Sequence, residues 1–146
     1  MTTHVIIDCD AAPFVPQGFR IKEHRKGGQI EFDPAKVVFY LDEEGQQVPY
    51  STIEGNELLK RLEGKPVMNA CVLDYLLANT NLLPESWKQD ERGRTRYIFF
   101  WGTFYLGLNH DLYVRCLYWE DGQWNWDSQR LDDSFGDQRP AALLAS

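Results

Sequence analysis

The chain has 146 residues, 43% of them hydrophobic and 25% charged, which is the composition of one globular domain with a single core. It carries 15 Lys and Arg against 22 Asp and Glu, and the formal charge of −7 disfavours a nucleic-acid partner. No apolar run could span a bilayer and no signal-peptide pattern is present, so we expect a cytoplasmic protein without a membrane partner.

The N-terminal third shows the alternation and the turn residues of short β-strands. A strand at 5–7 ends in the loop that begins at Asp8. The further predicted strands are 19–23, 29–32 and 36–41, of which the first two form a hairpin across Lys26-Gly27-Gly28, and a polar loop is expected at 42–45.

The segment from Arg20 to Lys26 is the most basic part of this region. As a strand it places Arg20, Lys22, His24 and Lys26 on one face. The simplest interpretation is a solvated face whose lysines discourage edge pairing. A surface that binds phosphate or an acidic partner is the alternative.

The middle of the chain changes to helical spacing. Ser51 or Thr52 is expected to cap a helix that runs to about Glu63 and stops at Gly64. The sequence then predicts a helix at 69–78, a brief helical turn at 82–87 with Trp87 packed on the core, and an exposed polar loop at 89–96.

Eleven of the 20 aromatic residues lie between Tyr97 and Trp126, which predicts a meander of strands at 97–106 and 112–120. Gly102 interrupts the first strand. Asp121-Gly122 predicts a two-residue type I′ turn, since these residues tolerate positive φ. In that register Trp119 faces Trp124, and the pair stabilises the hairpin by roughly 0.5 to 1 kcal/mol.

Residues 140–144 are expected to form one closing helical turn that lays Leu143 and Leu144 on the core. Together these elements predict a single compact domain over 1–146. Its fold class is α+β, with an antiparallel sheet of hairpins, including the aromatic-rich C-terminal meander, packed against two central helices.

Asp8 and Asp10 are the candidate metal ligands. Two carboxylates at the end of an apolar strand can converge on a hard cation such as Mg²⁺ or Mn²⁺. The alternative is an exposed turn in which the aspartates accept hydrogen bonds from local backbone N–H groups. The sequence has no motif for a cofactor, and its three cysteines have no metal or disulfide spacing.

The candidate binding residues lie on the predicted aromatic sheet. Arg115, Trp119, Trp124 and Trp126 share one face of the hairpin. If that face is covered, these residues belong to the core. If it is open, it is a platform whose residue types are those of protein interaction hot spots and of rings that stack on sugars.

Several segments of the chain resemble a group of small uncharacterised bacterial proteins. The resemblance implies a compact standalone domain and carries over no activity, cofactor or catalytic residue. It rests on Leu73-Asp74-Tyr75-Leu76-Leu77-Ala78-Asn79, Leu83-Pro84-Glu85-Ser86-Trp87-Lys88, Phe99-Phe100-Trp101-Gly102-Thr103, Leu112-Tyr113-Val114-Arg115 and Pro140-Ala141-Ala142-Leu143-Leu144-Ala145-Ser146.

The function expected from these patterns is that of a non-catalytic protein-binding or regulatory domain. No acid, base and nucleophile converge in the sequence, whereas a tryptophan-rich sheet and an acidic surface are present. Two alternatives stay open. One is a metal-dependent enzyme built on Asp8 and Asp10, and the other is a carbohydrate-binding module that uses the tryptophan face.

Overall fold

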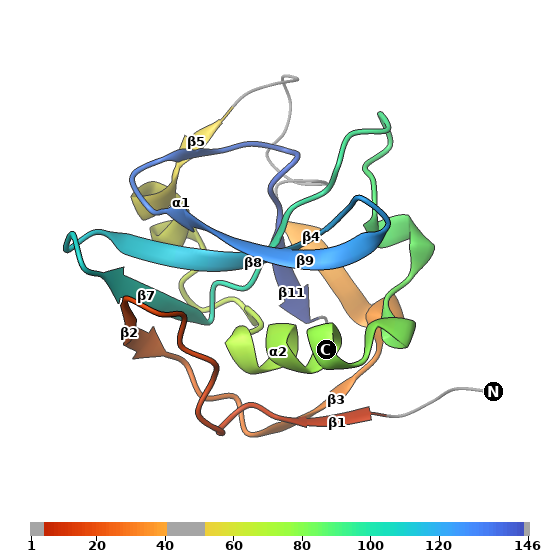
Figure 1. Cartoon of the computed structure of the whole chain (residues 1–146), viewed down its shortest axis with the longest axis horizontal. Coiled ribbons are helices and arrows are strands. Elements are labelled where there is room, and N and C mark those ends of the chain that lie inside the picture. Colours follow the sequence, from red (N-terminus) through yellow and green to blue (C-terminus); the bar gives the residue numbers. More distant parts are fainter. Residues whose placement is uncertain (1–4, 41–51, 145–146) are drawn as a thin grey trace.

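The computed structural model describes residues 5–40 and 52–144 (Figure 1). The helices are α1 (Gly55–Arg61) and α2 (Ala70–Ala78), and single 3₁₀ turns lie at Pro34–Lys36, Thr80–Leu82 and Glu85–Trp87. The strands are β1 (Val5–Asp8), β2 (Phe19–His24), β3 (Gln29–Phe32), β4 (Val37–Tyr40), β5 (Ile53–Glu54), β6 (Ile98–Phe99), β7 (Thr103–Gly107), β8 (Leu112–Glu120), β9 (Gln123–Arg130), β10 (Ser134–Phe135) and β11 (Ala141–Leu144). The loop predicted at 42–45 and the possible cap Ser51 lie outside the described residues.

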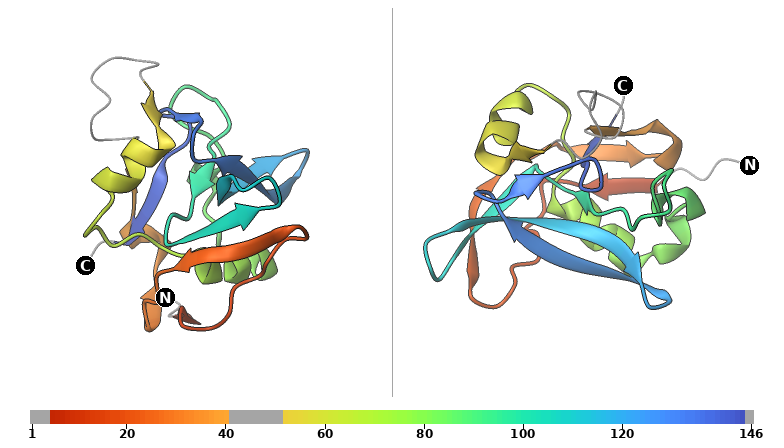
Figure 2. Two further views of the ribbon diagram at one scale, coloured as in Figure 1. Left: turned by 90° about the vertical axis from the view of Figure 1, so that its left-hand side faces the viewer. Right: turned by 90° about the horizontal axis from the view of Figure 1, so that it is seen from above.

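The main sheet has seven strands and is curled, as the two views of Figure 2 show. Its order is β2-β7-β8-β6-β11-β4, and β9 pairs with the remaining edge of β8. Strands β1 and β3 form one small antiparallel sheet, and β5 and β10 form another. The fold is therefore mostly β, which corrects the expectation of an α+β fold with a layer of two helices.

The sheet is also mixed, because β11 runs parallel to β6 and antiparallel to β4. The predicted helical turn at 140–144 is thus wrong. An apolar run without alternation has the same pattern in a buried helix and in a strand covered on both faces. Here Ala141 and Leu143 face one hydrophobic cluster and Ala142 faces the other.

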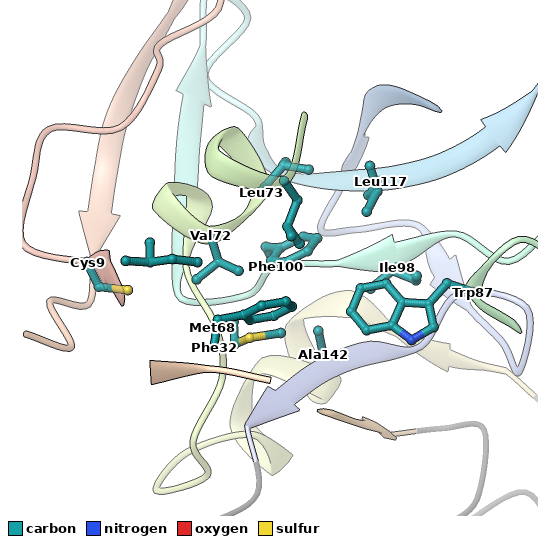
Figure 3. Packing of buried hydrophobic residues seen from close by; sticks show 12 residues of the cluster. Cys9, Phe32, Met68, Val72, Leu73, Trp87, Ile98, Phe100, Leu117 and Ala142 are labelled. Atoms are coloured by element: carbon teal, nitrogen blue, oxygen red, sulfur yellow. The ribbon is translucent and has the colours of Figure 1, made fainter. Parts of the chain in front are cut away.

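Two hydrophobic clusters cover the two faces of the central strands. The first holds α2 with Phe32, Phe100 and Leu117 (Figure 3), and the second holds α1 with Trp101 and Phe135. Consecutive residues of 98–101 alternate between the two clusters. Strands buried on both faces explain why the aromatic density of this region is so high.

Both helices were located by their spacing, and local signals set their ends. The side chain of Asn69 accepts a hydrogen bond from the Cys71 N–H at the start of α2, and Asn79 ends that helix as predicted. Helix α1 is capped by Glu54 rather than by Thr52, since Ile53–Glu54 is drawn into strand pairing with β10. Trp87 is buried, as expected.

The predicted N-terminal hairpin is wrong, although both of its strands exist. β2 pairs with β7, whereas β3 pairs with β1. Directly before the predicted turn, the backbone of Arg25 forms hydrogen bonds with other segments. Its N–H donates to Gly102 O (2.6 Å), and its carbonyl accepts from Asn69 Nδ2 (3.0 Å). The chain therefore passes from one sheet to the other at Gly28, whose φ is +70°.

The predicted strand at 97–106 is divided into β6 and β7. Both pair with β8, as the meander required. The division falls at Gly102, whose N–H donates to Met68 O (3.0 Å). A Cβ at this position would lie 2.8 Å from Asn69 Cα, so the absence of a side chain at Gly102 leaves room for the start of α2.

Candidate functional site

The hairpin of β8 and β9 is confirmed at the level of its turn and its register. Asp121 and Gly122 have φ values of +55° and +77°, as a type I′ turn requires. Trp119 lies opposite Trp124, and their ring centroids are 5.4 Å apart at 70°. The second strand of the hairpin, β9, continues to Arg130.

Arg115 lies on β8 of this hairpin, where its side chain is buried and is held by an ion pair and two aromatic rings. Its Nη1 donates to Asp74 Oδ1 of α2 at 2.9 Å, and the guanidinium carbon lies 5.1 Å from the centre of the Phe14 ring and 4.4 Å from that of Trp126. Only 1% of its surface is exposed. A cation between two rings is stabilised by their π electrons, so Arg115 supports both rings from below.

Phe14 is held in the same arrangement by its backbone. Its N–H donates to Asp74 Oδ2 (2.8 Å), and its carbonyl accepts from the Tyr105 hydroxyl (2.9 Å). Burial raises the pKa of Tyr105, which therefore remains a hydroxyl donor at neutral pH. Two side chains distant in sequence thus fix a loop residue whose own ring is half exposed.

The exposed part of this arrangement is an apolar patch formed by Phe14, Val15 and Trp126. Their exposed fractions are 50%, 40% and 37%. The rings of Phe14 and Trp126 meet edge to face, with centroids 5.8 Å apart. We refer to these three residues as the apolar patch.

The other two predicted tryptophans are more enclosed. The Lys88 ammonium lies 3.6 Å from the centre of the Trp119 ring, and Trp124 packs against the hydrophobic cluster of α2. The structure therefore divides the four predicted residues: Arg115 is core, Trp119 and Trp124 are partly covered, and Trp126 is exposed. Sequence reasoning missed Phe14 and Asp74, because neither has a local signal that links it to the hairpin.

The apolar patch lies beside an open sheet edge. β9 pairs with β8 and with no other strand in the described part of the chain. Because Glu120 and Gln123 flank a two-residue turn, the register turns the backbone N–H and C=O groups of Trp124 and Trp126 toward the open edge. The next outward N–H, that of Ser128, donates to the Asp127 carboxylate at 2.7 Å.

Asp8 and Asp10 form a local turn. Asp8 Oδ1 accepts from the Asp10 N–H (3.0 Å), and Asp10 Oδ1 accepts from the Gly28 N–H (2.9 Å). This is the alternative arrangement that the sequence allowed. Residues 5–40 and 52–144 contain no group of three or more His, Cys, Asp or Glu placed to hold a metal ion.

A second cluster, which the sequence did not indicate, joins Cys71 to His24. Cys71 Sγ lies 3.8 Å from His24 Nε2 and donates to Ala11 O at 3.2 Å. His24 Nδ1 lies 2.8 Å from Thr103 Oγ1. A cysteine at a helix start beside a histidine is the geometry in which a thiolate nucleophile could form.

The hydrogen bonds and the pKa of the thiol both oppose that chemistry. His24 Nε2 lies 3.1 Å from the Cys9 carbonyl, which can only accept, so this nitrogen carries the proton and cannot take one from the thiol. Burial, assisted by nearby negative groups, raises the pKa of Cys71 to about 11. The cluster therefore holds β2, β7 and α2 together as a polar contact.

No protein-family model, curated protein or solved structure was found to match this chain. Among the described residues, no helix has the length and apolar character needed to cross a membrane.

Proposed function

We propose that this chain is a non-catalytic protein-binding domain that adds an extended segment of a partner protein to the open edge of β9. The apolar patch of Phe14, Val15 and Trp126 provides the side-chain anchors. The observation that supports this proposal most strongly is the way in which Phe14 is held. Its ring is half exposed, yet its backbone N–H and carbonyl are both bound by distant side chains.

A rigid exposed ring lowers the entropy that binding would otherwise cost. Flexible loops lose conformational freedom when a partner docks, whereas Phe14 is already ordered by Asp74 and Tyr105. Tryptophan is also enriched at interaction hot spots. The rings of Trp126 and Phe14 both lie against Arg115, which supports them.

The open edge supplies the backbone part of the recognition. An added strand would bond to the outward N–H and C=O groups of Trp124 and Trp126, and specificity would come from its alternating side chains. Those on one side would meet the apolar patch. Those on the other side would meet Asp127, whose carboxylate is exposed and follows Trp126 directly.

The charge of the chain favours a basic partner segment. Asp127 lies on β9, and Glu120 and Asp121 lie at the turn end of the hairpin. An acidic edge attracts lysine and arginine and repels acidic segments. We therefore expect the bound segment to alternate apolar with basic residues.

A random peptide library displayed on phage, selected against the full chain, tests this proposal. Enriched peptides should alternate apolar with basic residues. In nuclear magnetic resonance titrations they should shift the amide signals of Trp124 and Trp126 more than others. Phe14→Ala and Trp126→Ala should each weaken peptide binding about 30-fold, as expected for hot spots worth about 2 kcal/mol.

Leu108→Ala is the matched control, because Leu108 is 85% exposed and lies outside the apolar patch. It should leave peptide affinity unchanged. Selection that enriches no peptide, or binding that Leu108→Ala weakens as much as Phe14→Ala does, would overturn the proposal. The unfolding midpoint of each variant must be measured in parallel, so that a loss of fold is distinguished from a loss of contact.

A further inference from the structure

A small cavity lies between the link from β2 to β3 and the segment that leads into α2. Its volume is about 220 Å³. Its lining includes the apolar residues Ile30, Met68 and Leu144, of which Met68 is buried, and the cations Arg25, Lys26 and Lys65, of which Arg25 and Lys26 are exposed. We refer to the part lined by the three cations as the mouth of the cavity. Met68 belongs to the hydrophobic cluster shown in Figure 3, so the floor of the cavity is the core itself.

The mouth of this cavity is built by hydrogen bonds from several segments. The backbone of Arg25 is fixed by Gly102 and by the buried Asn69. Its Nη1 donates to the carbonyl oxygen of Lys65 at 3.1 Å, which ties the side chain to the opposite wall. The Lys65 ammonium lies 5.2 Å from the centre of the Tyr40 ring. The side chain of Arg25 is therefore held against the segment that leads into α2.

The charge at the mouth is opposite to that of the whole chain. Among the described residues the cavity is lined by three cations and no carboxylate, although acids outnumber bases in the sequence and the formal charge is −7. Within residues 5–40 and 52–144, none of the three cations forms an ion pair. Unneutralised cations beside apolar walls attract an anion more strongly than they would in open water.

We propose that this cavity binds a small organic anion whose apolar part enters the cavity and whose carboxylate or phosphate group lies against Arg25, Lys26 and Lys65. The guanidinium of Arg25 can bind either group through two parallel N–H donors. The cavity has the volume of about seven water molecules at ~30 Å³ each, which limits the apolar part to a short chain or a single ring. The site shares no residue with the apolar patch.

Matched probes can test the apolar and the charged parts separately. Hexanoate and hexyl phosphate contain both parts, hexanol lacks the charge, and acetate and inorganic phosphate lack the chain. We expect hexanoate or hexyl phosphate to bind at least tenfold more tightly than the three incomplete probes in calorimetric titration. The preferred member of the pair then identifies the head group. Their binding should shift the methyl signals of Ile30, Met68 and Leu144.

Substitution of the cations at the mouth should weaken binding while the fold is kept. Lys26→Gln with Lys65→Gln should weaken the tighter probe at least tenfold and should reduce the salt dependence of its affinity. Lys22→Gln with Lys60→Gln removes the same charge from exposed positions outside the cavity and should leave the affinity unchanged. Melting curves of both variants show whether each is folded.

Four results would overturn the proposal. They are the absence of binding by hexanoate and hexyl phosphate, equal binding of hexanol, equal loss of affinity in the two double variants, and methyl shifts confined to another part of the molecule. The first would show that the cavity does not hold such an anion, and the second would leave an apolar recess without a charge requirement. The last two would show that the anion binds through overall charge or at a different place.

Discussion

Arg115 shows how one buried charge organises the surface above it. The guanidinium has an ion pair with Asp74 and lies against two rings, while its Nε has no hydrogen-bond partner in the structure. Asp74 in turn accepts the N–H of Phe14. A single carboxylate therefore neutralises the buried cation and orients the exposed ring.

Asp74→Ala should lower the free energy of unfolding by about 3 kcal/mol. Removing one member of a buried pair leaves the other charge without compensation, at a cost of about 3 to 5 kcal/mol, and the 28% exposure of the Asp74 side chain favours the lower end. Urea denaturation followed by circular dichroism measures the change. Asp132→Ala is the control, since its ion pair with Arg130 is exposed on both sides and should contribute little to stability. Equal losses in the two variants would contradict this account of Arg115.

At the residue scale the hairpin could be predicted from the sequence, but most of the contacts that hold Arg115 could not. Asp121-Gly122 and the alternation of β8 were enough to place Trp119 opposite Trp124, because these are local properties of a two-residue turn. Of the partners of Arg115, Trp126 follows from the hairpin register, whereas Phe14 and Asp74 come from the loop after β1 and from α2, and no spacing relates them to β8. The candidate site could therefore be predicted only in part.

Among the elements, the segment 100–102 between β6 and β7 packs closely against the backbone of Asn69 at the start of α2. Gly102→Ala should destabilise the chain by about 1 to 3 kcal/mol, because the new Cβ would lie within 2.9 Å of three atoms of Asn69. Thermal and urea unfolding measure the effect. Gly27→Ala is the control: its Cβ would lie 3.6 Å from Cys9 Cβ, an ordinary contact. A Gly102→Ala variant as stable as Gly27→Ala would show that α2 can move away.

The elements also show where local patterns fail. Helix α2 was predicted within one residue of its observed start, since its apolar stripe and Asn caps are local. β2 and β3 were predicted as strands but paired wrongly, because their partners β7 and β1 are determined by which apolar faces can be buried together. β11 was taken for a helix because both of its faces are buried, which removes the alternation of a strand.

For the whole molecule, we expect acid to lower the free energy of unfolding by protonating a carboxylate in the loop at 88–97. Burial by itself would raise the pKa of Asp90, but hydrogen bonds from the N–H groups of Arg94 and Arg92 and from the Arg94 guanidinium outweigh it and lower the pKa. Arg94 also binds Asp137 (3.0 Å), so this loop is joined to the segment before β11. A carboxyl group with a lowered pKa stabilises the fold above its unfolded-state pKa, about 3.9, and this stabilisation is lost as the pH falls through the folded-state value.

The free energy of unfolding should therefore fall below about pH 4, and Asp90→Asn should make that fall smaller while lowering stability at pH 7. Urea unfolding across the range from about pH 7 to pH 3 measures both effects. Glu85→Gln is the control, because the Glu85 side chain is 87% exposed and its pair with Lys88 is local. A pH profile of Asp90→Asn that runs parallel to that of the unsubstituted chain would rule out this origin of the acid sensitivity.

The position of β11 between β4 and β6 has a consequence for how the chain is made. Both neighbours precede it in the sequence, and until residues 141–144 leave the ribosome each of them presents an unpaired edge. The two hydrophobic clusters also remain incomplete, since β11 contributes to both. The nascent chain therefore exposes unpaired strand edges during synthesis, and its main sheet becomes continuous only when β11 pairs with both β4 and β6.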